Sequence, residues 1–196
     1  MAAGISRDAA WDLLTQWVES PSLRRHCLAV ETAMRAYAAA GGHDVELWGA
    51  AGLLHDMDYE KHPDMDSPDG HPRTALKVLA EQGYPDELVR AVASHADFLG
   101  VSRDSDMEKA LYAVDELSGF IMACAYVRPT GIHGLTPKSV KKKMKTPAFA
   151  AAVNRDELRE GAEKLGVDFD EHLAFVIAAL EEHADELDLN GSAAHA

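Results

Sequence analysis

Apolar residues recur every three or four positions along most of the chain, the spacing of an α-helix that buries one face. In one segment, Leu23, Cys27, Val30, Met34 and Tyr37 fall on the same helical face. The pattern predicts helices over about 7–18, 22–40, 44–56, 72–82, 85–98, 105–126, 154–165 and 168–188. The chain shows no alternating strand pattern of note and no internal repeat, so we expect an all-α fold.

Residues with special backbone or capping properties lie at the ends of these segments. Ser6, Asn154 and Asp168 are expected N-caps, because their side chains can accept hydrogen bonds from unpaired amides of the first turn. The Gly41-Gly42 pair is expected to end the second helix. The polar stretch KHPDMDSPDG, rich in Pro, Asp and Gly, predicts a loop before the helix that Pro72 opens.

The length of 196 residues and the 47% hydrophobic content predict one globular domain over residues 1–190. We expect its core over about 20–126. A break at Arg128-Pro129-Thr130-Gly131 precedes a C-terminal helical extension over about 130–190. The tail 191–196 is expected to be frayed.

Composition restricts which binding partners and which cellular compartment we expect for this protein. The net charge of -14, from 19 basic and 33 acidic residues, disfavours nucleic acid polymers and anionic membranes as partners. Cys27 and Cys124 lie far apart and are expected to be buried free thiols. The N-terminus lacks a signal-peptide apolar region, and no apolar run approaches the ~20 residues of a membrane span, so we expect a soluble cytoplasmic protein.

An ordered series of histidine and aspartate residues carries the candidate chemistry. Imidazole and carboxylate groups suit zinc, iron, manganese and related ions. The series consists of His26, His55-Asp56, His71, His95 and Asp115. These groups could hold one ion or two, and the residues alone leave both possibilities open.

Each member of the series also has a simpler interpretation. His26 lies among apolar residues, where a lone histidine is more often a hydrogen-bonded core residue than a ligand. Asp115 is the sharpest clue, because a carboxylate in the middle of an apolar helix should be paired, protonated or bound to metal. Several helices that each send one ligand inward are typical of metal sites in helical bundles.

These residues carry a resemblance to the HD superfamily of metal-dependent phosphohydrolases. The HxxxxE stretch at His26–Glu31, the LLHDMDY stretch with His55-Asp56, and LYAVDELSG with Asp115 resemble its motifs in this order. More narrowly, the chain resembles small stand-alone predicted HD hydrolases over nearly its whole length. The resemblance implies an HD-domain helical bundle, with metal held by His26, His55, Asp56 and Asp115.

His71 and His95 match the additional histidines of binuclear members, in which the counterpart of Asp56 bridges two ions. The resemblance therefore implies two divalent ions, drawn from Fe, Mn, Zn, Ni, Co and Mg. His62 is an alternative to His71 in the same loop, and we favour His71 because the helix that follows would fix it. The other histidines lie in polar contexts and are expected at the surface: His43, His133, His172, His183 and His195.

The expected reaction is hydrolysis of a phosphate ester of a small phosphorylated metabolite or nucleotide by metal-activated water, with the enzyme acting as a phosphomonoesterase or a phosphodiesterase. Asp56 would orient or deprotonate the water, and Lys61 is a second candidate catalytic residue because its loop adjoins the ligands. Basic side chains suit phosphate binding. The candidates for that role are Lys61, Arg128, Lys138 and Lys142. Asp58 and Tyr59 could support the ligands or position substrate.

Two other functions fit the same residues. The six-ligand pattern also resembles HD-type mixed-valence di-iron oxygenases, which ligand identity alone does not separate from binuclear hydrolases. A non-catalytic protein that binds a phosphorylated metabolite around a structural metal is the other alternative. The sequence contains no nucleotide-binding glycine loop.

Overall fold

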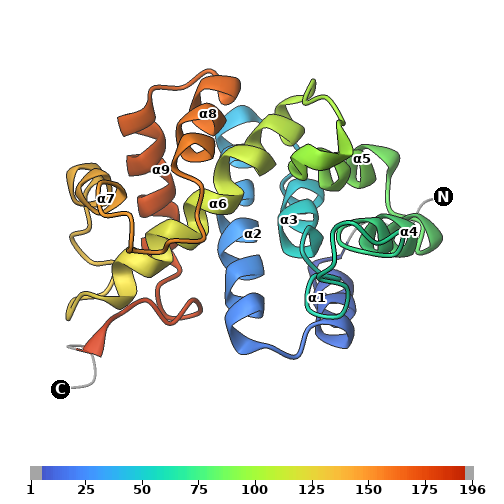
Figure 1. Ribbon diagram of the computed structural model, residues 1–196, viewed down its shortest axis with the longest axis horizontal. Coiled ribbons are helices and arrows are strands. Elements are labelled where there is room, and N and C mark those ends of the chain that lie inside the picture. Colours follow the sequence, from blue (N-terminus) through green and yellow to red (C-terminus); the bar gives the residue numbers. More distant parts are fainter. Residues whose placement is uncertain (1–5, 193–196) are drawn as a thin grey trace. The chain divides into compact units, whose positions relative to one another are not determined.

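The computed structural model describes residues 6–192, and within them it contains nine α-helices, one short 3-10 helix and no strand (Figure 1). The helices are α1 (Arg7–Trp17), α2 (Pro21–Gly41), α3 (Val45–Leu54), α4 (Arg73–Glu81), α5 (Asp86–His95), η1 (Asp97–Leu99), α6 (Asp106–Tyr126), α7 (Pro137–Met144), α8 (Arg155–Leu165) and α9 (Phe169–Glu182). The prediction of an all-α fold is confirmed.

The predicted helix ends are correct where a capping group defines them. Ser6, Asn154 and Asp168 each accept a hydrogen bond from a first-turn amide. Gly42 ends α2 with a φ of 71°, a left-handed conformation that glycine adopts without strain.

Other ends differ from the prediction. The helix expected over 44–56 ends at Leu54, and the one expected over 168–188 ends at Glu182. Pro72 is the N-cap of α4, one position earlier than the first turn in which it was expected. α7, in the lysine-rich segment, was not predicted as a separate helix. Residues 193–196 of the predicted frayed tail lie outside the described part of the chain.

The chain divides into two compact units, Met1–Tyr112 and Ala113–Ala196. The division falls inside α6, whose helix is continuous from one unit into the next. The single domain over 1–190, with its core at 20–126, remains a prediction.

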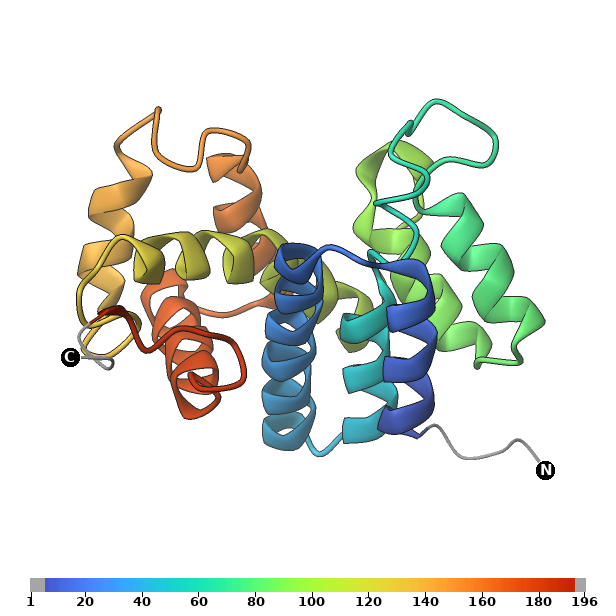
Figure 2. The same ribbon diagram turned by 90° about the horizontal axis from the view of Figure 1, so that it is seen from below.

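α3 forms the centre of the first unit. Every residue from Leu47 to Leu54 is buried, as expected for a short helix that is apolar all round. α3 packs against α1, α2 and α5 (Figure 2). The burial of α3 on all sides fixes the position of its C-terminal end, and His55 and Asp56 follow that end directly.

Gly49 and Gly52 in α3 allow a close approach to α2. A Cβ atom on Gly52 would lie 2.9 Å from both the carbonyl oxygen of Val30 and the amide nitrogen of Glu31. These are backbone atoms, which cannot rotate away as a side chain would. Only glycine therefore fits at this contact, and the contact sets the spacing between α2 and the end of α3.

Gly52→Ala is expected to lower the free energy of unfolding by about 1–3 kcal/mol, because the added methyl group overpacks this contact. Gly41→Ala is a suitable control, since its Cβ would meet only the movable ring of His43. Urea denaturation of the two variants measures the difference. An unfolding midpoint unchanged by Gly52→Ala would contradict the close packing of α2 on α3.

α4 and α5 form an antiparallel helical pair in the first unit (Figure 2). Gly83, with a φ of 79°, makes the turn between them. His71 lies just before α4 begins, and His95 is the last residue of α5. An antiparallel pair places the start of one helix beside the end of the other, so the two histidines lie at the same end.

In the second unit, α9 packs against α7 and α8. His172 on α9 corrects an expectation, because it is buried and not at the surface. Its Nε2–H donates to the carbonyl oxygen of Ala113 at 3.0 Å, and burial lowers its pKa. The neutral ring is thus part of the unit's core.

Both cysteines are buried free thiols, as predicted. Burial raises the pKa of the Cys124 thiol to about 11, so the thiol stays protonated and unreactive near neutral pH. Among the described residues, no helix combines the length and the apolar composition that crossing a membrane requires.

Candidate metal centre

The six side chains of the histidine and aspartate series come together in two groups of three. In each group, one ligand atom from every residue lies within 4.8 Å of the others. The groups are His26, His55 and Asp115, and Asp56, His71 and His95. Each group has a composition that could hold a metal ion.

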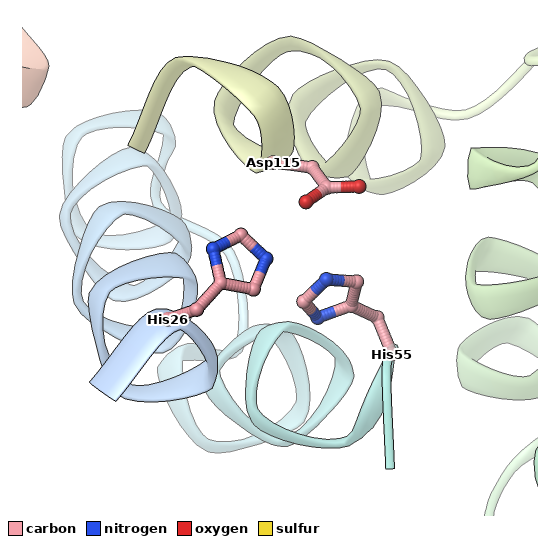
Figure 3. A group of neighbouring side chains, drawn as sticks. All are labelled: His26, His55 and Asp115. Carbon is pink, nitrogen blue, oxygen red and sulfur yellow. The ribbon is translucent and has the colours of Figure 1, made fainter. Parts of the chain in front are cut away.

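The side chains of the first group point toward one another (Figure 3). His26 comes from the second turn of α2, His55 is the C-cap of α3, and Asp115 lies in α6. The close contact of α2 with α3 brings the two histidine rings to a centroid distance of 5.3 Å.

The second group lies wholly in the first unit. His71 and His95 come from the shared end of the α4–α5 pair, and their Nε2 atoms are 3.2 Å apart. Asp56, two residues beyond the end of α3, supplies the carboxylate. The contact of α3 with α5 explains how residues distant in sequence meet here.

The carboxylate of Asp56 faces four histidines at once. Its Oδ2 atom lies 3.7 Å from Nε2 of His26 and 3.6 Å from Nε2 of His55. Its Oδ1 atom lies 3.3 Å from Nε2 of His71 and 3.7 Å from Nε2 of His95. Each oxygen is thus directed at a different pair of imidazoles, as in a carboxylate that bridges two sites.

Hydrogen bonds at the opposite ring nitrogen fix the tautomer of three histidines. Nδ1 of His55 lies 2.7 Å from the carbonyl oxygen of Gly52, and Nδ1 of His95 lies 2.5 Å from that of Val92. Nδ1 of His71 lies 2.7 Å from the carboxylate of Asp58. Since all three partners only accept, each Nδ1 carries a proton, and each ring directs its Nε2 atom toward Asp56.

Asp58 supports the second group through a hydrogen bond to His71. The side chain is fully buried, with one oxygen accepting from His71 Nδ1 and the other from the amide of Ala75 at 2.8 Å. It therefore holds the ring of His71 against the first turn of α4. This contact agrees with the supporting role that the sequence suggested for Asp58.

The residues fit divalent metal ions. Lone pairs of several imidazoles facing one carboxylate repel one another unless a cation or proton lies among them. Ligand atoms about 2.1 Å from a common ion lie about 3–3.5 Å from each other, close to the N–O separations around Asp56. His55 is buried, but the side chains of His26 and Asp56 are 21% and 18% exposed, so solvent reaches part of the ligand set.

Arg103 is a neighbour of the site that sequence reasoning missed. Its guanidinium donates to the carbonyl oxygen of His95 at 3.4 Å and to the carboxylate of Asp97, and it lies 3.5 Å over the ring of Tyr112. It thereby ties the segment after α5 to the end of that helix. No local pattern around Arg103 indicates this role, because its partners are set by the tertiary fold.

The predicted basic residues have other partners. Lys61 Nζ donates to the carbonyl oxygen of Gln16 at 2.9 Å and lies over the ring of Trp17, both in α1. Arg128 donates to the carbonyl oxygens of Gly131 and His133 and so holds its own turn together. Their predicted roles in catalysis or substrate binding remain predictions.

Lys138 and Lys142 are exposed on α7 of the second unit, and their predicted part in phosphate binding is likewise a prediction.

The remaining histidines are placed as follows. The ring of His62 lies 6.0 Å from that of Trp17, outside both groups, whereas His71 belongs to the second group; that His71 is the loop ligand remains a prediction. His43, His133 and His183 are exposed, as predicted. His195 lies outside the described residues.

Comparison with known protein families adds one finding. Residues 23–119 match the model of the HD domain, and this range contains all six members of the two groups. No curated protein and no solved structure shows a significant match to the chain.

Proposed function

We propose, from the premise that this chain belongs to the HD-domain family, that it is a metal-dependent phosphohydrolase. Proteins of this family are typically metal-dependent phosphohydrolases. The substrate would be a phosphate ester of a small metabolite or nucleotide. Water adds to phosphorus, the bond from phosphorus to the ester oxygen breaks, and the alcohol leaves with a proton.

The arrangement around Asp56 carries this proposal. Two carboxylate oxygens directed at two separate pairs of histidine Nε2 atoms form a donor set that would hold divalent ions, with Asp56 and the four histidines as the residues that contribute. When bound, divalent ions in such a site supply Lewis acidity toward phosphoryl oxygens and acidify water near neutral pH.

The charge of the ligand set favours a phosphate substrate despite the acidic composition of the chain. Four neutral imidazoles and two carboxylates together carry two negative charges. Two divalent ions would therefore leave an excess of positive charge in the site. That local charge attracts a phosphate group, whereas the net charge of -14 acts over the whole surface and is screened by salt.

The protein's own groups have distinct parts in this reaction. The partly exposed carboxylate of Asp56 is placed to orient a water molecule and to take its proton as the water adds to phosphorus. The backbone acceptors at Gly52 and Val92 keep His55 and His95 in the tautomer that ligates through Nε2. Asp58 does the same for His71.

The test combines metal analysis with an assay. Protein purified without added metal or chelator is expected to contain two divalent ions per chain by mass spectrometry. It should release inorganic phosphate from members of a phosphoester panel, lose this activity with EDTA, and regain it with Mn²⁺ under anaerobic conditions.

Two results would count against hydrolysis. Folded protein that binds metal normally but releases no phosphate from any ester would contradict the proposal. Iron with a mixed-valence electron paramagnetic resonance signal and substrate-dependent O₂ consumption would instead favour the oxygenase alternative. The same six ligands could serve that chemistry.

A further inference from the structure

A pocket opens in the first unit beside the candidate metal centre. Its volume is about 440 Å³, within the range of small-molecule sites. One wall is the start of α2, with Ser20, Ser22 and His26, and the other is the segment after Asp56, with Tyr59 and Glu60. Neither Lys61 nor any other lysine or arginine among the described residues lines it.

The pocket reaches the first ligand group directly, and Tyr59 in its wall contacts the second. His26 lines the pocket and belongs to the first group. Tyr59 lines it and packs edge-on against the ring of His71, a member of the second group, with 5.3 Å between ring centroids. A phosphoester with its phosphate at the metal centre would therefore have its alcohol portion in this pocket.

The chemistry of the walls restricts that alcohol. Ser20, Ser22 and Tyr59 offer hydroxyl groups, and Leu23 and Pro63 offer apolar surface. Glu60 contributes a carboxylate that is held in place, since its Oε2 atom accepts from the amides of Glu19 and Ser20 at 3.0 and 2.9 Å. A second phosphate or a carboxylate on the substrate would meet this negative charge without a basic side chain to offset it.

We infer that the pocket takes the leaving alcohol of a small phosphomonoester, and that this alcohol bears hydroxyl groups and no further negative charge. The inference rests on the proposed phosphohydrolase function for the position of the phosphate. It excludes bisphosphates, phosphorylated carboxylic acids and nucleoside polyphosphates as preferred substrates. Glu60 is the residue that determines this specificity.

The first experiment compares two substrates of similar size, glycerol 1-phosphate and 3-phosphoglycerate, in the Mn²⁺-loaded protein. The ratio of their kcat/KM values is expected to favour glycerol 1-phosphate. Glu60→Gln should reduce that ratio roughly five-fold by improving 3-phosphoglycerate, because an exposed carboxylate repels only moderately. The amide oxygen of Gln can still accept from Glu19 and Ser20.

The matched control is Glu81→Gln, an exposed carboxylate on α4 outside the pocket wall, which should leave the ratio unchanged. A ratio that already favours 3-phosphoglycerate in the unsubstituted protein, or that is unaffected by Glu60→Gln, overturns the inference. A ratio that changes equally in both variants also overturns it, since the effect would then be one of net charge.

A second experiment does not depend on turnover. Ser22→Cys places an exposed thiol in the wall, while Cys27 and Cys124 are 0% and 1% exposed. Glycerol 1-phosphate is expected to slow alkylation of the Mn²⁺-loaded variant by uncharged iodoacetamide, and 3-phosphoglycerate to slow it less at equal concentration. Absent or equal protection overturns the inference.

The two experiments separate this inference from the proposed function. Selective protection by glycerol 1-phosphate in a protein that hydrolyses no ester would support the pocket's preference while contradicting phosphohydrolysis. Phosphate release without a preference between the two substrates, and without protection by either, would support phosphohydrolysis while contradicting the pocket's preference.

Discussion

Replacing Asp56 with Asn is expected to lower kcat/KM for phosphoester hydrolysis by more than about 100-fold. Loss of a ligand's outer partner alone costs 10–100-fold, and Asp56 faces all four histidines directly. The amide keeps the shape of the side chain but removes its charge and one of its two accepting oxygens. Metal content should fall below two ions per chain, while circular dichroism retains the helical signal.

Asp66→Asn is the control for this prediction, because Asp66 is an exposed carboxylate in the loop that follows. It should retain both activity and metal content. If Asp56→Asn hydrolysed esters at the original rate with both ions bound, the bridging arrangement would not be the catalytic one. If it lost stability but not turnover, a structural metal would be the better interpretation.

The second large effect is expected for Asp58→Asn, which should weaken metal binding by about 10–100-fold. The buried carboxylate accepts from both His71 and Ala75, whereas an amide has one accepting oxygen and presents N–H groups to the other donor. His71 would then lose its fixed tautomer. Competition with a chromophoric chelator measures the affinity for Zn²⁺ or Mn²⁺.

Asp69→Asn provides the comparison, since this exposed carboxylate lies in the same connection between α3 and α4. A thermal melt of each metal-free variant separates a loss of fold from a loss of affinity. Equal affinities for Asp58→Asn and the unsubstituted protein would show that His71 needs no support from this carboxylate.

The sequence was sufficient for the fold class because periodicity and caps are local properties. Ser6, Asn154 and Asp168 cap the helices they precede, and the helical spacing of apolar residues is correct for α2. The helix ends without a capping signal were less well predicted. The helix expected over 44–56 ends at Leu54, so His55 and Asp56 lie just beyond it.

The sequence indicated the ligands of the candidate site but not the contacts that hold these ligands in place. The six histidine and aspartate residues stand out because such groups are costly on an apolar face. Which oxygen of Asp56 faces which histidine depends on tertiary contacts that leave no trace in local sequence. The same applies to His172, whose polar neighbours in sequence suggested the surface although its ring is buried against Ala113.

The α4–α5 pair has a mechanical consequence for the two groups. His71 and His95 both lie on this pair, whereas His55 and Asp56 follow α3. A displacement of the pair as one body would carry both of its Nε2 atoms together, so it would change one spacing in particular, that between these two histidines and Asp56. Substitutions at the α3–α5 contact are therefore the means by which that spacing could be tuned while α2 and α3 are left intact.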